Sequence, residues 1–126
     1  MTFGFKPLAE VWSENRHGSW QRNMRLHRAW AEGTAWEWKG LPSSVRKTWK
    51  GVPATVHVTL TFREKRRRDP HNFVGTVVKA IVDGLVRAGV WPDDNPQWVT
   101  VIEPEIRIGS PWVQIRLEER HAVRQP

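Results

Sequence analysis

Cationic residues and metal-binding residue types meet in one stretch of this chain, residues 65–94. Four consecutive cations, Lys65 to Arg68, run directly into Asp69-Pro70-His71, and a second acidic pair, Asp93 and Asp94, follows an apolar-striped segment. Cations bind phosphodiester oxygens, and carboxylates can hold a divalent metal ion against the same phosphate. The combination is typical of metal-assisted hydrolysis of a nucleic-acid backbone.

The charge balance favours the same class of partner. The 126 residues include 20 Lys and Arg against 13 Asp and Glu, which gives a formal charge of +7 at pH 7. Such a field attracts a polyanion, nucleic acid before an anionic membrane surface. The absence of Cys excludes disulfides and thiolate zinc sites and fits a reducing compartment. No apolar run has the length of a membrane span, and the first residues lack the apolar core of a signal peptide. We expect a single-domain cytoplasmic protein with no membrane partner and no small-molecule cofactor.

The first half of the chain predicts one helix and one strand. Residues 1–18, with Gly4, Pro7 and Gly18, are expected to be irregular. Ser19 is a suitable cap for a helix to about Lys39, although Gly33-Thr34 could break it. The expected inner face of this helix comprises Trp20, Met24, His27, Ala31 and Trp38. Residues 54–63 alternate between apolar and polar types, which predicts a half-buried strand with Val56, Val58, Leu60 and Phe62 facing inward.

The second half predicts a helix and two further strands. Residues 76–88 carry apolar side chains at helical spacing and end at Gly89. Strands are expected over residues 98–108 and 112–118, with Pro104 at a sheet edge or a bulge, and residues 119–126 form a short tail. The predicted fold class is α+β: a small mixed sheet packed with two main helices in one domain covering residues 1–126.

The motifs of residues 66–94 resemble those of the RusA family of Holliday-junction resolvases, which are homodimeric, magnesium-dependent endonucleases often carried by phages. The matching residues are the basic run with Asp69-x-His71-Asn72, then Lys79-x-x-x-Asp83-x-Leu85, Gly89 and Asp93-Asp94. The resemblance covers roughly residues 54–102. It implies a RusA-like fold that resolves four-way DNA junctions by paired cuts, as a homodimer with Mg²⁺.

The resemblance also implies roles for individual residues. The catalytic residues would be Asp69, Lys79, Asp83 and Asp94, with Asp83 pairing with Lys79 along the helix to orient it. The metal ligands would be Asp69, His71, Asp93 and Asp94. The DNA-binding residues would be Arg63, Lys65, Arg66, Arg67, Arg68 and, from a weaker match near the start of the chain, Asn15 and Arg16.

Two departures from the family pattern bear on the chemistry. His71 stands where the family has an aspartate, and a neutral imidazole suits Mn²⁺ better than the oxygen-preferring Mg²⁺. About four extra residues precede Lys79, roughly one helical turn and about 6 Å of rise if all are helical. We expect residues 72–75 to form a longer loop instead, with Thr76 capping the helix, which would keep Lys79 in register.

Each residue type also has a purely structural interpretation. Asp93 and Asp94 lie in ordinary turn composition, the basic run can be a solvated surface, and His71 can be a loop residue. Most Trp residues are expected in the core or a dimer interface, with Trp91 and Trp98 as the candidates for DNA contact. Three function classes therefore remain: a metal-dependent junction endonuclease, a branched-DNA-binding protein with weak or no catalysis, and a plain basic nucleic-acid-binding module.

Overall fold

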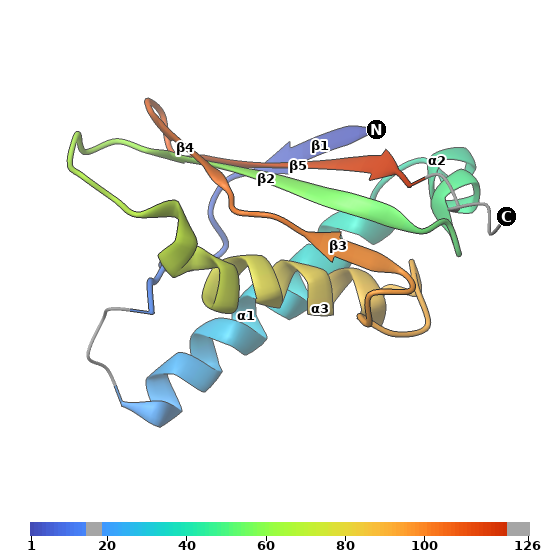
Figure 1. The fold of residues 1–126 in the computed structure, drawn as a ribbon, viewed down its shortest axis with the longest axis horizontal. Helices are drawn as coiled ribbons and strands as arrows, with labels where there is room; N and C mark the ends of the chain where they lie inside the picture. The colour runs from blue at the N-terminus through green and yellow to red at the C-terminus, as the bar shows by residue number, and fades with distance from the viewer. Residues whose placement is uncertain (15–18, 121–126) are drawn as a thin grey trace, which may run out of the picture.

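The computed structural model describes residues 1–14 and 19–120, and over this range the chain forms one α+β domain. A mixed five-stranded sheet lies on two long helices, and its other face carries no helix (Figure 1). The strands are β1 (Thr2–Phe5), β2 (Ala54–Phe62), β3 (Val99–Val101), β4 (Glu105–Ile108) and β5 (Trp112–Glu119). The helices are α1 (Trp20–Lys39), α2 (Ser43–Trp49) and α3 (Lys79–Arg87), and α3 is preceded by a 3₁₀ turn, η1 (Pro70–Phe73), and a π-helical turn, η2 (Val74–Val78).

The sheet is built around β2. Its order is β1-β5-β2-β3, with β4 also paired to β2 beyond the end of β3. β5 is antiparallel to both β1 and β2, whereas β3 and β4 are parallel to β2. The chain therefore returns from β2 through α3 to a parallel edge strand. Pro104 lies between β3 and β4 at this edge, as the sequence predicted, and divides the expected strand of residues 98–108 in two.

The core lies between the sheet and the helices α1 and α3. The alternation predicted for residues 54–63 is confirmed: Val56, Val58 and Leu60 are buried against the helices, and Phe62 is partly buried. The opposing residues of β5 and α3 complete the core, including Val113, Ile115, Leu117, Ile81 and Leu85. The predicted helix end at Gly89 is also confirmed, with a φ of 87° that glycine adopts without strain.

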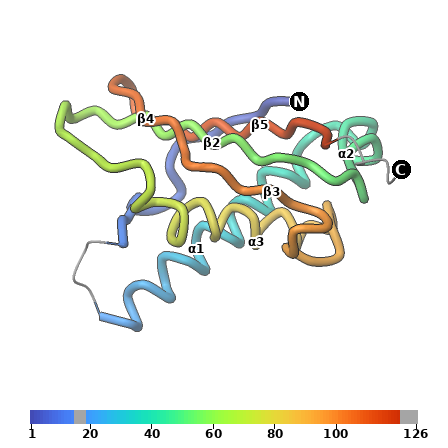
Figure 2. Tube along the Cα trace, viewed as in Figure 1, coloured from blue at the N-terminus to red at the C-terminus, as the bar shows by residue number. Residues whose placement is uncertain are grey.

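The long helix predicted after Ser19 is confirmed, but its predicted inner face is partly wrong. The Ser19 side chain accepts a hydrogen bond from the backbone N–H of Arg22, and Gly33-Thr34 does not break the helix. The buried residues of α1 are Trp30, Ala31, Thr34, Ala35 and Trp38. Trp20 and Met24 remain exposed, at 71% and 43%. They lie on the first turns of α1, which extend past the sheet (Figure 2).

Three further predictions need correction. Residues 1–18 are not all irregular, because Thr2–Phe5 pair with β5 as an edge strand and Trp12 enters the core. Residues 43–49 form a helix, α2, that the sequence did not indicate, since none of its residues is buried. Residues 72–75 are not a loop, because helical hydrogen bonding begins at Pro70 and continues through the π-helical turn into α3.

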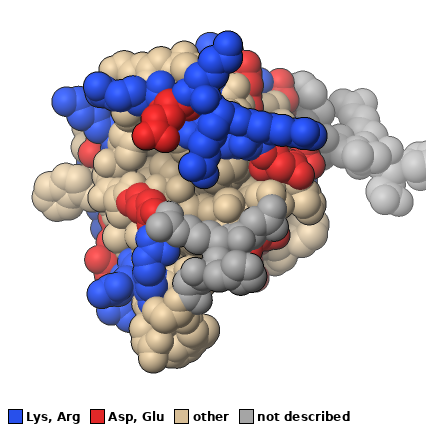
Figure 3. Space-filling view, turned by 90° about the vertical axis from the view of Figure 1, so that its left-hand side faces the viewer, with Lys and Arg blue, Asp and Glu red and all other residues tan. Residues whose placement is uncertain are grey.

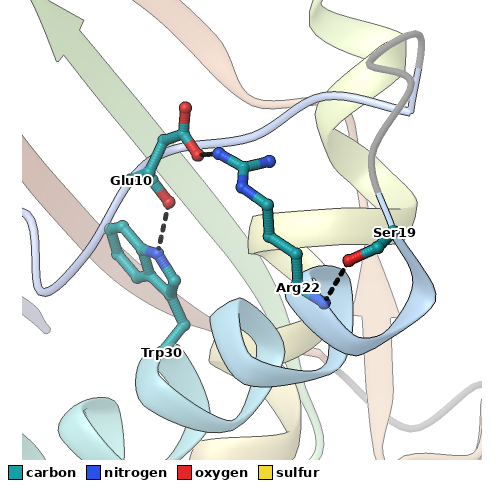
Figure 4. Close-up of polar contacts among 4 residues, drawn as sticks. All are labelled: Glu10, Ser19, Arg22 and Trp30. Carbon is teal, nitrogen blue, oxygen red and sulfur yellow. Dashed lines mark hydrogen bonds and ion pairs between the residues drawn. The ribbon is translucent and has the colours of Figure 1, made fainter.

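Polar contacts join Glu10, in the segment before α1, to side chains of that helix (Figure 4). The Arg22 guanidinium pairs with the Glu10 carboxylate, and the Trp30 indole N–H donates to the Glu10 carbonyl at 2.9 Å. These contacts hold residues 10–14 between α1 and the start of the η1–α3 helix. The segment thereby becomes a wall of the surface cavities described next.

Candidate nucleic-acid interface and catalytic groups

The basic loop that joins β2 to η1 presents most of its cations to solvent. Arg63, Lys65, Arg66 and Arg67 are all exposed. On the side of the molecule that carries this loop, Lys and Arg side chains gather over the end of the sheet (Figure 3). Because these exposed side chains form no ion pair with the described residues, they can contact a phosphate backbone without first breaking one. The predicted DNA-binding residues Asn15 and Arg16 lie outside the described residues.

Arg68 differs from its neighbours because it is used to fold the loop. Its guanidinium lies 3.9 Å from the centre of the Phe62 ring and donates to the carbonyl of Glu64 at 2.9 Å. Partial burial, and then repulsion from Arg66, lower the pKa of Arg68, but an arginine stays charged in proteins. Arg68 therefore shapes the loop and adds positive potential, and it has fewer free donors for DNA than Arg67 has.

A wide surface cleft opens beside this loop. It has a volume of about 570 Å³ and runs between residues 10–13 and the basic loop. A neighbouring hollow of about 310 Å³ shares Ser13, Arg66, Arg68 and Phe73 with it and extends to Asp69. The two hollows adjoin in one groove lined by Arg66, Arg67 and Arg68, with Phe73 in the lining of both hollows and with Glu10 and Phe62 in that of the larger. Such a lining suits a sugar–phosphate chain, because the cations can hold the phosphates.

Asp69 closes the basic loop and begins the helix. Its side chain accepts a hydrogen bond from the backbone N–H of His71 at 3.0 Å, as an N-cap does. The His71 ring faces another carboxylate, with 3.3 Å between His71 Nδ1 and Glu103 Oε1, and both side chains are largely exposed. Asp69 therefore has a structural role that accounts for its position, whether or not it also binds a ligand.

Glu14 reaches the same helix start from the other side. Its carboxylate accepts from the backbone N–H of Gly75 at 3.1 Å, and its own N–H donates to the Asn72 carbonyl at 2.9 Å. A side chain at position 75 would collide with the Glu14 carboxylate. Glu14 was not among the predicted site residues. A lone glutamate in an irregular segment gives no signal in the sequence that it will meet a residue 61 positions later.

The acidic turn that follows α3 is far from Asp69 in the same chain. Figure 1 shows the β2–η1 loop and the α3–β3 loop at opposite ends of the η1–α3 helix. Helical structure from Pro70 to Arg87 spans roughly 27 Å at about 1.5 Å per residue. The Asp93 carboxylate accepts from the Asp94 N–H at 2.7 Å and from the Asn95 amide at 3.2 Å, and these hydrogen bonds lower the pKa of Asp93. Both aspartates are exposed.

The predicted metal ligands therefore do not fit a metal ion within one chain. Asp69 and His71 lie at one end of the helix and Asp93 and Asp94 beyond the other. Throughout residues 1–14 and 19–120, no group of three or more His, Asp or Glu side chains is placed to hold a metal. The structure brings Asp69 close to His71 and to the cationic groove, but not to the second acidic pair.

Lys79 and Asp83 lie one turn apart on α3, and the predicted pairing between them is replaced by another. Asp83 Oδ2 lies 2.7 Å from Nε2 of His27, which comes from α1. Lys79 is exposed, and no hydrogen bond or ion pair joins its side chain to a described residue. His27 was predicted to be structural. Its contact with Asp83 crosses 56 positions of sequence, and its own spacing on α1 carried no sign of it.

The predicted DNA contact through Trp91 is wrong. Trp91 is only 2% exposed, and its indole N–H donates to the Val52 carbonyl at 2.7 Å. Trp98 is partly buried against the core.

No protein-family model matches the chain, and no curated protein matches it either. In the described part of the chain, no helix combines the length and the apolar character that a bilayer crossing requires.

Proposed function

We propose that this protein is an endodeoxyribonuclease that binds branched DNA, in particular four-way junctions, and cuts it by hydrolysis of the phosphodiester backbone. The observation that carries the proposal is the cationic groove, which is lined by Arg66, Arg67 and Arg68 of the β2–η1 loop and extends to Asp69. A long lysine-bearing helix starts from the same place. This arrangement supports the RusA-like fold and function that the motifs imply.

The groove explains selectivity for structure over sequence. Arg63, Lys65, Arg66 and Arg67 are long flexible cations on one loop, which suits contacts to phosphates rather than hydrogen bonds to base edges. Recognition would then depend on the path of the backbone, and a junction offers paths that linear duplex does not. Because each neutralised phosphate releases counterions, binding should weaken steeply as salt rises.

We propose a divalent metal only for a dimer, because the aspartates at the two ends of the η1–α3 helix are too far apart in one chain. In a dimer whose two-fold axis is perpendicular to this helix, the helices of the two chains run antiparallel. Asp69 of one chain could then approach Asp94 of the other, and either His71 or Asp93 could complete the ligand set. Mg²⁺, or Mn²⁺ given the imidazole, would supply charge compensation at the phosphate.

A homodimer also suits the substrate and the surface. Resolution of a four-way junction needs two opposed cuts, and a two-fold dimer supplies two equivalent sites. At the sheet edge, Val101 of β3 and the following Ile102 expose apolar side chains. The β4–β5 hairpin exposes two more, Ile108 and Trp112. An open strand edge with apolar neighbours is a common site of association.

Mixed dimers test this proposal. Asp69→Asn and Asp94→Asn should each abolish nicking of a labelled four-way junction while preserving binding, since each removes a negative charge facing the phosphate. When the two variants are co-expressed, random pairing makes about half of the dimers mixed, and each mixed dimer has one site with both native carboxylates. About a quarter of the wild-type nicking rate should return.

The alternative outcomes are distinct. If both carboxylates acted from the same chain, no mixed dimer would contain an intact site and no activity would return. If Asp94→Asn nicks junctions at the wild-type rate, the acidic turn takes no part in the chemistry. Light scattering that shows only a 14.7 kDa monomer at micromolar concentration would remove the dimer.

A second candidate function is binding of branched DNA without metal-dependent cutting. It is favoured by the lack of a three-ligand metal group among the described residues of one chain. The two functions separate in a single assay, because a binder would shift a four-way junction in a gel yet leave it uncut in Mg²⁺ and in Mn²⁺. A plain basic module would in addition bind linear duplex as tightly as the junction.

A further inference from the structure

The closest approach of α1 and α3 places a histidine against an aspartate. Gly84 has no room for a side chain, since a Cβ there would lie 2.5 Å from the Ala31 carbonyl oxygen. His27 lies one turn before Ala31, and Asp83 directly precedes Gly84. The crossing therefore brings the two side chains together, with 2.7 Å between His27 Nε2 and Asp83 Oδ2. Each side chain is 29% exposed, so the pair is reachable from solvent.

The hydrogen bond fixes which ring nitrogen can act as a base. An ionised carboxylate only accepts hydrogen bonds, so the shared hydrogen belongs to Nε2 of His27. In the neutral ring the free lone pair is then on Nδ1, which has no hydrogen-bond partner among the described residues. General-base catalysis by histidine uses this arrangement, in which a carboxylate holds the imidazole in one tautomer and stabilises its protonated form. In the serine-protease triad the carboxylate binds Nδ1 and the base is Nε2, whereas here the two nitrogens are exchanged.

His27 also borders a cavity of suitable size. The cavity has a volume of about 400 Å³ and is lined by polar groups from residues 13–14 and Asn23, together with Trp12, Trp20 and Met24. Trp20 and Met24 are among the most exposed large apolar side chains of the described residues, at 71% and 43%. Exposed apolar side chains beside the polar groups of a cavity are suited to pack against a sugar or a base.

A cation lies on the same helix. Lys79 precedes Asp83 by one turn of α3 and is exposed. A lysine at this place can neutralise the nonbridging oxygens of a phosphate whose phosphorus faces the His27 ring. The base, its orienting carboxylate and the cation all belong to one chain, unlike the predicted metal ligands.

We propose that His27 is the general base of this protein, that Asp83 is its positioning residue, and that Lys79 binds the scissile phosphate. This inference rests on the proposed phosphodiester hydrolysis and places the scissile phosphate at His27 and Lys79 rather than between Asp69 and Asp94; nicking that survives in Asp94→Asn but is lost in His27→Ala would distinguish the two positions. Nδ1 of His27 removes a proton from water as the water oxygen forms a bond to phosphorus. The bond from phosphorus to the leaving sugar oxygen breaks on the side opposite to the attack, and that oxygen takes a proton from a solvent water while the imidazolium returns its proton to solvent. A phosphodiester and water give a phosphomonoester and an alcohol.

The experiment is chemical rescue of His27→Ala. Loss of a general base should lower the nicking rate by about 10²- to 10⁴-fold, while junction binding stays unchanged. Added imidazole should restore part of the rate, and among imidazoles of similar size the restored rate should rise with their basicity. His57→Ala is the matched control, since His57 also pairs with a carboxylate, Glu118 at 3.2 Å, on the helix-free face of the sheet. It should nick at the wild-type rate.

Each result supports or overturns the inference. His27→Ala with wild-type nicking overturns it, as does rescue that is independent of the basicity of the imidazole, which would indicate that the ring only fills space. The same measurements on the small phosphodiester bis(4-nitrophenyl) phosphate separate this inference from the proposed function. Basicity-dependent rescue on that ester without any junction cutting would keep His27 as the base and overturn the junction specificity. A wild-type protein that hydrolyses neither substrate overturns both.

Discussion

The substitution Gly84→Ala should both destabilise the fold and separate His27 from Asp83. The new methyl group would lie 2.5 Å from the Ala31 carbonyl oxygen and 2.8 Å from Cβ of Thr34. Nonbonded heavy atoms meet at about 3.5–4.0 Å, so α1 and α3 must move apart by about 1 Å. The obstacle is backbone at the middle of a helix, which cannot rotate away as the end of a side chain can.

The magnitude follows from two opposed effects. Overpacking a buried contact costs about 1–3 kcal/mol, and replacing glycine by alanine inside a helix returns up to about 1 kcal/mol. Since the clash involves a main-chain atom, we expect a net loss of about 1–2 kcal/mol in the free energy of unfolding. For a chain of this length that corresponds to a fall in Tm of roughly 4–8 °C.

Gly40→Ala is the control for this measurement. Gly40 has a φ of −78°, which alanine adopts freely, and a Cβ there would meet nothing closer than 3.4 Å. It should leave the stability unchanged or raise it by up to about 1 kcal/mol. Urea unfolding followed by circular dichroism gives both values, and nicking of a four-way junction reports the His27–Asp83 contact. A Gly84→Ala protein that is as stable as wild type, with full activity, would refute the close crossing of α1 and α3.

Three further substitutions test other features of the structure. Thr34→Val should stabilise the protein by about 1 kcal/mol in urea unfolding, because the buried Thr34 hydroxyl has no hydrogen-bond partner among the described residues and valine has nearly the same shape. A loss of stability would reveal a partner for that hydroxyl. Arg67→Gln should make the dependence of log K on log salt for junction binding less steep, by up to about 0.9 in the slope. Arg68→Gln should change the slope less, because the Arg68 guanidinium already contacts Phe62 and Glu64. Equal slopes for the two variants would show that Arg68 reaches the DNA as freely as Arg67.

The elements that the sequence predicted correctly are those with a local signal. The strict alternation of residues 54–62 is enough to assign both faces of β2, because one face of a half-buried strand must be apolar. Ser19 and Gly89 likewise mark the ends of their helices through backbone hydrogen bonding and φ. The position of Pro104 at the sheet edge was also predictable, because proline has no backbone N–H to donate to a neighbouring strand.

The missed elements depend on partners distant in sequence. β1 exists because residues 2–5 pair with β5, more than a hundred positions later, and its own four residues give no clear pattern. The exposure of Trp20 and Met24 depends on where the sheet ends relative to α1, and helical periodicity contains no such information. The His27–Asp83 contact requires the α1–α3 crossing, which is set by the small residues Ala31 and Gly84.

The segment from Pro70 to Val78 decides which chemistry is available to one chain. A loop over residues 72–75 would have kept Lys79 close to Asp69, and a catalytic lysine would then have shared a site with the first acidic residue. The segment is instead helical, because Asp69 caps its first turn and Glu14 satisfies the N–H of Gly75 within it. The helical residues therefore separate Asp69 from Lys79 by roughly 15 Å along the axis, at about 1.5 Å per residue. In a single chain Lys79 lies one turn before Asp83, which pairs with His27. The carboxylates at the two ends of the helix can act together only across two chains.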